Sequence, residues 1–128
     1  MAVIDQSRYA ALIRRYFDAC NEADYDKLVS CFTPDAVHYF PAGLPDIPWR
    51  TADVIARKWQ WCVENLGSQW TIERILVSHD SHEAVIEWTH WKAKLGKALR
   101  GDSGMSSMKP ADSSKRFARI THRRRTRT

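Results

Sequence analysis

The hydrophobic residues in the first half of the chain recur every three or four positions in three segments, which is the spacing of the buried face of an amphipathic helix. Residues that can cap helices stand beside these segments: Asp5 or Ser7, Asp24 and Thr51 at the starts, and Gly67 at the end of the third. The pattern predicts three helices. Their stripes are Tyr9, Leu12, Ile13, Tyr16, Phe17 and Cys20; Tyr25, Leu28, Val29 and Phe32; and Ile55, Trp59, Cys62, Val63 and Leu66.

Strand patterns lie between and after these helices. The segment AVHYF, residues 36–40, is rich in β-branched and aromatic residues and predicts a strand. Two longer strands are predicted in QWTIERILVS, residues 69–78, and in EAVIEWTHWKAKL, residues 83–95, joined by the polar residues 79–82. This order of elements predicts an α+β domain in which a curved sheet wraps around helices. An irregular loop is expected after the first strand, at Pro41, Gly43, Pro45 and Pro48.

The composition is that of one globular domain. The chain has 128 residues, of which 44% are hydrophobic, so it is long enough to bury a core. Cys20, Cys31 and Cys62 are widely spaced within helical patterns, which favours reduced, buried thiols over disulfides or a zinc site. The sequence shows neither a signal peptide nor a membrane span, and from this we expect a cytoplasmic protein.

The positive charge is concentrated at the end of the chain. Residues 102–128 hold eight basic and two acidic residues, whereas residues 1–101 hold 12 basic and 13 acidic ones. We therefore divide the chain into a domain of residues 1–101 and an atypical basic tail of residues 102–128 that is frameshifted or poorly ordered. A basic arm can bind nucleic acid or an acidic membrane through their phosphates, but a shifted reading frame is the simpler explanation.

Three segments resemble the SnoaL-like and ketosteroid isomerase-like branch of the nuclear transport factor 2-like superfamily. They are YFDACNEADYDKLVSCFTPDAVHYFPAG, RTADVI at the start of the third helix, and EAVIEWTHWKAK. The resemblance covers about residues 8–101. It implies a cone-shaped α+β fold in which three N-terminal helices pack on a curved, mostly antiparallel sheet. Because many activities share one fold, it does not by itself fix a function.

The two strands that close the sheet in this family are not evident after Asp102. Codons chosen for SGMSSMKPADSSKRFARITH, when read from the third letter, encode WYEFDEAGGLIKEIRAYYA, which is similar to those two strands. We hypothesise that the reading frame is shifted just after Asp102, so that the arginine-rich end binds neither nucleic acid nor membrane. The alternative is that MSSMK and RFARITHRR form substitute strands.

The resemblance also implies places for catalytic groups. In the ketosteroid isomerase pattern a tyrosine at the place of Tyr16 donates a hydrogen bond to an oxyanion; an ordinary buried tyrosine is the alternative. The general-base aspartate of that pattern corresponds to Phe40 and is absent. His38 shares the strand face of Phe40 and is our candidate base, unless it is a core histidine. The Asp–His dyad of dehydratase relatives corresponds to Asn21 and Gln69 and is also missing.

Strand alternation adds a second histidine. His90 shares a face with Ile86 and Trp88, which we expect to be the cavity face, and it would present a second imidazole opposite His38. Spacing fixes no acidic ligand beside these histidines, so we expect no metal. Large rings around a cavity would select an apolar or aromatic ligand. The candidate substrate-binding residues are Phe40, Trp49, Trp59, Trp61, Trp88, Asn21 and Gln69.

These observations lead to two functional hypotheses. The first is a small enzyme without a cofactor that acts on an apolar or aromatic molecule by proton transfer, as an isomerase, cyclase, dehydratase or related lyase. In it His38 is the base, and Tyr16 and His90 polarise the substrate. The second is a non-catalytic module that binds a small molecule or dimerises. Members of the family commonly form homodimers through the outer sheet face, where Trp91 would suit such a contact.

Overall fold

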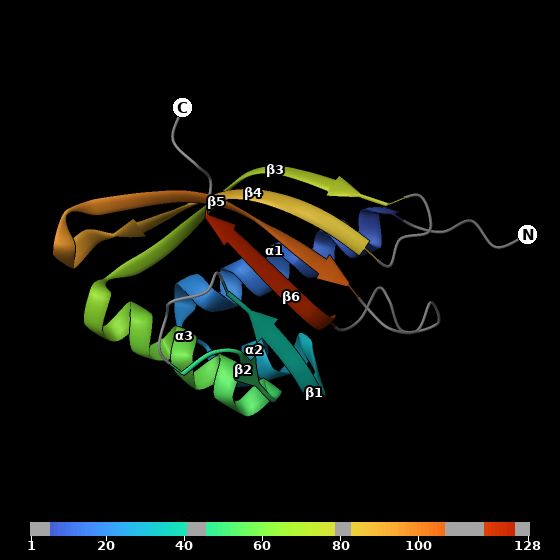
Figure 1. Ribbon diagram of the computed structural model, residues 1–128, viewed down its shortest axis with the longest axis horizontal. Coiled ribbons are helices and arrows are strands. Elements are labelled where there is room, and N and C mark those ends of the chain that lie inside the picture. The colour runs from blue at the N-terminus through green and yellow to red at the C-terminus, as the bar shows by residue number, and fades with distance from the viewer. Residues whose placement is uncertain (1–5, 41–45, 79–82, 107–116, 125–128) are drawn as a thin grey trace, which may run out of the picture.

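The computed structural model describes residues 6–40, 46–78, 83–106 and 117–124. Three helices lie on one side of a curved six-stranded sheet, and together they form the predicted cone-shaped α+β fold (Figure 1). None of these helices is both long and apolar enough to cross a membrane.

The three helices lie where the hydrophobic stripes predict, except that Phe32, assigned to the second stripe, is the first residue of the strand Phe32–Tyr39. They span Gln6–Glu22 (α1), Tyr25–Ser30 (α2) and Ala52–Leu66 (α3). The Asp24 and Thr51 side chains accept hydrogen bonds from backbone N–H groups and cap α2 and α3, as predicted. Gly67 adopts the left-handed conformation, with φ of 66°, and ends α3. Ser7 lies inside α1 and is not its cap, and Asp5 lies outside the described residues.

The sheet has the strand order β2-β1-β6-β5-β4-β3. β1 and β6 are parallel, and every other neighbouring pair is antiparallel. The short 3-10 helix Ala93–Leu95 (η1) connects β4 to β5. The strands span Phe32–Tyr39 (β1), Trp49–Arg50 (β2), Ser68–Val77 (β3), Glu83–Lys92 (β4), Lys97–Ser106 (β5) and Phe117–Arg124 (β6).

The segment after Asp102 contributes to this sheet. It forms the end of β5 and the whole of β6, in which Ser103 pairs with His122 and Met105 with Ile120. β6 lies between β5 and β1 and thus joins the two parts of the sheet (Figure 1). β6 corresponds to RFARITHRR in the alternative of substitute strands; of MSSMK, Met105 and Ser106 form the end of β5, and residues 107–109 lie outside the described residues. The hypothesis of a shifted reading frame concerns the gene and stays a prediction.

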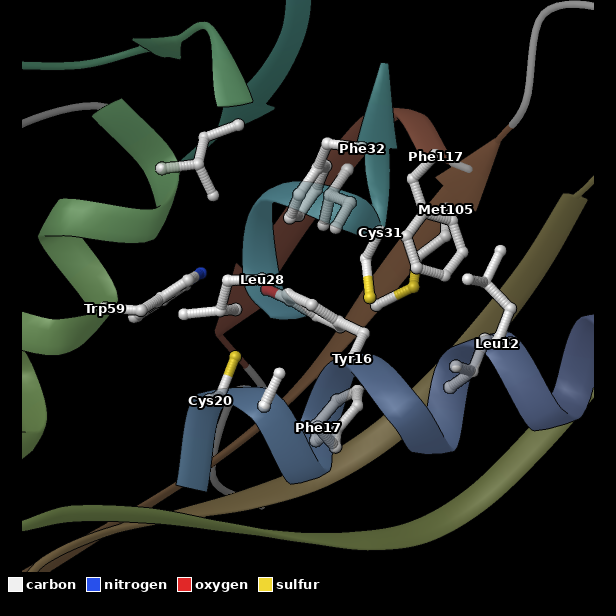
Figure 2. Packing of buried hydrophobic residues seen from close by; sticks show 14 of the residues in the cluster. Leu12, Tyr16, Phe17, Cys20, Leu28, Cys31, Phe32, Trp59, Met105 and Phe117 are labelled. Atoms are coloured by element: carbon white, nitrogen blue, oxygen red, sulfur yellow. The ribbon is translucent and has the colours of Figure 1, made fainter. Parts of the chain in front are cut away.

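Aromatic rings from α1, β1 and β6 pack together in the core. Tyr16 contacts Phe17, Phe32 and Phe117 edge to face, with ring centroids 5.4, 5.3 and 5.8 Å away. Figure 2 shows the Tyr16 side chain rising from α1 between these rings. Edge-to-face pairs stabilise a core beyond the burial of their area. The packing fixes α1 against β1 and β6 and holds the Tyr16 hydroxyl inside the domain.

Candidate functional site

Two histidines from neighbouring strands face each other inside the cone. His38 lies on β1 and is fully buried, and His122 lies on β6. Their Nε2 atoms are 2.9 Å apart, and their rings stack with centroids separated by 4.1 Å. β1 and β6 are parallel, with His38 beside Ile120. Because alternate residues share a face, His122 points to the same side as Ile120 and so reaches His38.

The hydroxyl of Tyr16 completes this contact from α1. It lies 3.3 Å from Nε2 of His38. Burial raises the pKa of Tyr16 well above its ordinary value, and the nearby Cys20 thiol raises it further. The phenol therefore keeps its proton at neutral pH, and it is available as a hydrogen-bond donor.

Ser103 and Trp88 extend the hydrogen bonds on the other side of the pair. Nδ1 of His122 is hydrogen-bonded to Oγ of Ser103, which accepts a 2.8 Å hydrogen bond from the indole N–H of Trp88. These side chains come from the three adjacent strands β4, β5 and β6. We name Trp88, Ser103, His122 and His38 the histidine line.

Both histidines of the line are neutral at physiological pH. Burial lowers the pKa of His122 to about 3, and the nearby His90 acts in the same direction. Burial also lowers the pKa of His38 well below its ordinary value, and His122 lowers it further. A charged imidazole is disfavoured away from water. Each ring therefore carries one N–H and one lone pair.

Two buried ring nitrogens near Tyr16 have no hydrogen-bond partner. Within the described residues, the Trp59 indole nitrogen and Nδ1 of His38 are buried without a hydrogen-bond partner. Figure 2 shows the indole nitrogen of Trp59 directed toward the Tyr16 hydroxyl. Burying a polar group without a partner costs free energy, commonly about 1–3 kcal/mol. Such groups can be retained where a ligand or water supplies the partner.

The interior between these side chains is nearly filled. A void of about 10 Å³ remains there, which is the size of a single water molecule. Its walls include the Tyr16 and His122 of the contact described above. The lining residues are Tyr16, Phe17, Cys20, Trp59, Trp70, Trp88 and His122.

A larger pocket lies near His38 and is separated from it by aromatic side chains. It has a volume of about 670 Å³, and its walls include Phe40, Trp49 and Trp61. Phe40 stacks on the His38 ring at 4.9 Å, and the Trp49 ring lies 5.5 Å from it. Two aromatic side chains thus separate the pocket from the histidine pair. The volume is within the range of small-molecule sites.

His90 lies on the predicted cavity face of β4 but binds a different partner. Its Nε2 is 2.7 Å from Oγ of Ser68, and its ring stacks on Trp70 at 4.5 Å. Burial lowers its pKa to about 4, and the nearby Lys92 adds to the shift. The imidazole whose Nε2 contacts that of His38 belongs to His122 instead.

Asn21 and Gln69 connect α1 to β3. The Asn21 side chain donates to the Trp70 carbonyl at 3.0 Å and accepts from the Trp70 N–H at 2.7 Å. Gln69 is exposed, and it donates to the Asn21 carbonyl at 3.0 Å. These contacts fix the end of α1 against the sheet. Among the predicted tryptophans, Trp59 and Trp88 are buried, Trp49 is half-buried and Trp61 is exposed.

Sequence reasoning missed Ser103 and His122, because it attributed the segment after Asp102 to a shifted frame. A signal was present in RFARITHRR. As a strand, this segment places Ile120 and His122 on one face, and the apolar Ile120 marks that face as the buried one.

Comparisons with known proteins identify the family. A solved structure of a protein of unknown function with a cystatin-like fold from Methylobium petroleophilum PM1 is 38% identical, with a TM-score of 0.90; the match covers 99% of this chain and 82% of that one. Curated proteins give no significant match.

More distant structures share the fold alone. A putative ketosteroid isomerase from Kribbella flavida DSM 17836 is 17% identical, with a TM-score of 0.78 over 99% of this chain and 84% of that one. A putative polyketide cyclase from Sinorhizobium meliloti is 18% identical, with a TM-score of 0.71 over 93% of this chain and 99% of that one.

The SnoaL-like domain family matches residues 13–122. The chain belongs to the SnoaL-like domain family.

Proposed function

We propose that this protein is a small enzyme without a cofactor that acts on an apolar or aromatic small molecule by general acid–base proton transfer. The reaction would be that of an isomerase, cyclase, dehydratase or related lyase. The observation that carries the proposal is the position of Nε2 of His38, which lies between the Tyr16 hydroxyl and Nε2 of His122, two side chains that line the small void. A neutral imidazole in such a place can act as a general base.

The proposed step is abstraction of a proton from a carbon next to a carbonyl group. Nε2 of His38 takes the proton, and the electron pair of the C–H bond moves to the carbonyl oxygen, which becomes an enolate. The Tyr16 O–H and the unpartnered Trp59 N–H are the donors available to this oxygen. The imidazolium of His38 then returns the proton to the same carbon or to a conjugated one. No net oxidation or reduction occurs.

The aromatic pocket supports an apolar substrate. Its rings Phe40 and Trp49 cover His38, so a ligand reaches the base once these side chains rotate. Arg57 and Lys58 stand at the same pocket but already pair with Asp53 and Asp46. The neutral part of the wall is therefore the part that selects the ligand. We expect neither nucleic acid nor a membrane as a partner.

We also propose that the protein acts as a cytoplasmic homodimer. Leu76, Val85 and Trp91 are exposed on the face of the sheet that is turned away from the helices. Apolar and aromatic residues gathered on one face favour a protein contact. Light scattering of the wild type and of Trp91→Glu tests this, since a dimer through this face should dissociate in the variant. A wild-type monomer would contradict the proposal.

Proton exchange tests the proposed function without knowledge of the natural substrate. The probe is 2-tetralone, an aromatic ketone with acidic hydrogens beside the carbonyl, and its exchange in D₂O is followed by NMR. We expect the wild type to exchange these hydrogens faster than buffer alone does. In His38→Gln the catalysed exchange rate should fall by at least about a hundredfold, which is what a general base commonly contributes. Tyr39→Phe, next to His38 but on the opposite strand face, is the matched control.

Two results would count against the enzyme. A folded His38→Gln variant with the wild-type exchange rate would remove the assigned base. Binding of 2-tetralone by the wild type, detected by tryptophan fluorescence, without faster exchange would favour the second candidate, a non-catalytic binding module. The observation that favours this candidate is the nearly filled interior, which leaves the 670 Å³ aromatic pocket as the place for a ligand.

A further inference from the structure

The direction of the hydrogen bonds along the histidine line follows from its first member. An indole N–H can only donate, so Oγ of Ser103 is the acceptor of the 2.8 Å bond from Trp88. Ser103 is fully buried, and within the described residues its hydroxyl has one further partner, Nδ1 of His122. The Ser103 hydrogen therefore points to that nitrogen, since in any other direction it would be a buried donor without an acceptor.

This direction fixes the protonation of both imidazoles. Nδ1 of His122 accepts from Ser103, so the single N–H of the neutral ring is at Nε2. That N–H lies 2.9 Å from Nε2 of His38, which must then be the acceptor. The proton of neutral His38 is consequently at Nδ1, and its lone pair is at Nε2.

The resulting form of His38 is the less favourable one for its own surroundings. Nδ1 is buried without a partner within the described residues. With the proton on Nδ1 an N–H donor is left unsatisfied, whereas the opposite tautomer would leave only a lone pair there. Local strain that the surrounding structure imposes is often part of a mechanism. This tautomer leaves the lone pair of His38 at Nε2, the atom that faces the Tyr16 hydroxyl and His122.

We propose that Trp88, Ser103 and His122 are positioning residues that hold His38 in the tautomer with a bare Nε2. This inference rests on the proposed function, because it supplies the atom that would remove the proton. A neighbouring group that holds a catalytic histidine in one tautomer can decide whether the histidine works as a base. In the free protein the His122 N–H covers the lone pair. The reacting C–H of the substrate replaces this contact when it binds.

Nitrogen NMR of the histidine rings at pH 7 tests the assignment directly. Two-bond ¹H–¹⁵N correlations distinguish a protonated from a bare ring nitrogen. We expect the N–H at Nδ1 in His38 and at Nε2 in His122. In Ser103→Ala we expect His122 to populate both tautomers and His38 to lose part of its Nδ1–H form. Trp88→Phe should act in the same direction, because Ser103 is then free to donate or accept.

Trp91→Phe is the matched control. Trp91 is on the same strand as Trp88, and its indole N–H also donates to a hydroxyl on a neighbouring strand, Oγ1 of Thr71 at 3.0 Å. It is not part of the histidine line, so both tautomers should stay as in the wild type. Trp88→Phe also removes buried apolar area and could fail to fold. In that case Ser103→Ala still tests the inference.

The activity readout separates this inference from the proposed function. Ser103→Ala should slow 2-tetralone exchange by about ten- to a hundredfold, the range found when a residue that orients a metal-binding histidine is replaced. The inference is overturned if wild-type His38 carries its proton on Nε2, or if folded Ser103→Ala keeps the wild-type tautomers. The assigned tautomers with no wild-type exchange would instead overturn the proposed function alone.

Discussion

The two halves of the candidate site both contact aromatic rings, but they differ in their hydrogen bonds. Tyr16 and His38, from α1 and β1, lie among packed aromatic rings. His122, from β6, also contacts rings, but it is in addition hydrogen-bonded to Ser103 on β5 and to His38. Ring packing fixes where a side chain lies, but it does not fix which nitrogen carries a proton. Hydrogen bonds from an obligate donor do fix it. The comparison indicates that the first half gives the site its place and the second its protonation.

Truncation after Asp102 is the strongest way to break this comparison. It removes β6 and the end of β5, so that β1 and β2 lose their connection to the rest of the sheet. The loss of a central strand exposes unpaired edges and the core. We expect residues 1–102 to lack cooperative thermal unfolding by circular dichroism, whereas the full chain should show it. A truncated chain that unfolds cooperatively would instead support a self-sufficient domain of residues 1–101.

The gene sequence is the independent check on the second half. Sequencing across codons 100–104 shows whether the frame that encodes Ser103 and His122 is the natural one. If the other frame is natural and encodes WYEFDEAGGLIKEIRAYYA, the natural protein lacks the histidine line. Confirmation of the present frame would remove the shifted-frame hypothesis.

Aromatic rings pack between the two halves of the site, and the contribution of one ring from each half to stability can be compared. Phe32 on β1 and Phe117 on β6 are both buried and lie 6.0 Å apart, and each contacts Tyr16. Because each truncation leaves a cavity of similar size, we expect Phe32→Ala and Phe117→Ala each to lower the free energy of unfolding by about 3–5 kcal/mol. Chemical denaturation measures both. A cost for Phe117→Ala below about 1 kcal/mol would show that β6 is not part of the core.

The periodic part of the chain was predictable, and the reason is burial. α1, α2 and α3 each bury one stripe, and β3 and β4 alternate, so hydrophobic spacing alone indicates them. β6 could be inferred only weakly, because exposed Arg119 and Thr121 alternate with buried Ile120 in a basic segment. Hydropathy thus locates buried faces, while the composition of exposed positions carries little information about the fold.

The site was predictable only in part. Tyr16 was a candidate because the resemblance implies an oxyanion donor at its place, and His38 because it shares a strand face with Phe40, where the resemblance implies a base. The contact between His38 and His122 joins residues 84 positions apart, and it depends on the parallel pairing of β1 with β6. No local pattern encodes that pairing. Asn21 and Gln69, which the resemblance placed at a substrate site, connect α1 to β3, and their role in binding a substrate stays a prediction.

The protonation of the second half can be measured through stability. The pKa of His122 is about 3 in the folded protein, against about 6.5 for an unfolded histidine. The unfolded state therefore binds more protons between these values, and the free energy of unfolding falls as pH drops from about 6.5 toward 3. A neutral side chain at this position removes the contribution. In His122→Gln the stability should thus fall less steeply, by about 1 kcal/mol per pH unit near pH 5.

Denaturation of the wild type and His122→Gln at several pH values between 4 and 7 measures this difference. Carboxyl groups titrate in the same range, but they are common to both proteins and cancel in the comparison. His38, whose pKa is also lowered by burial and by His122, remains in the variant, so part of the wild-type slope should persist. Parallel stability curves for the two proteins would mean that His122 is accessible to water and protonates in the folded state. In that case the line from Trp88 could not hold it neutral, and the distinction between a packed half and a protonation-setting half would no longer stand.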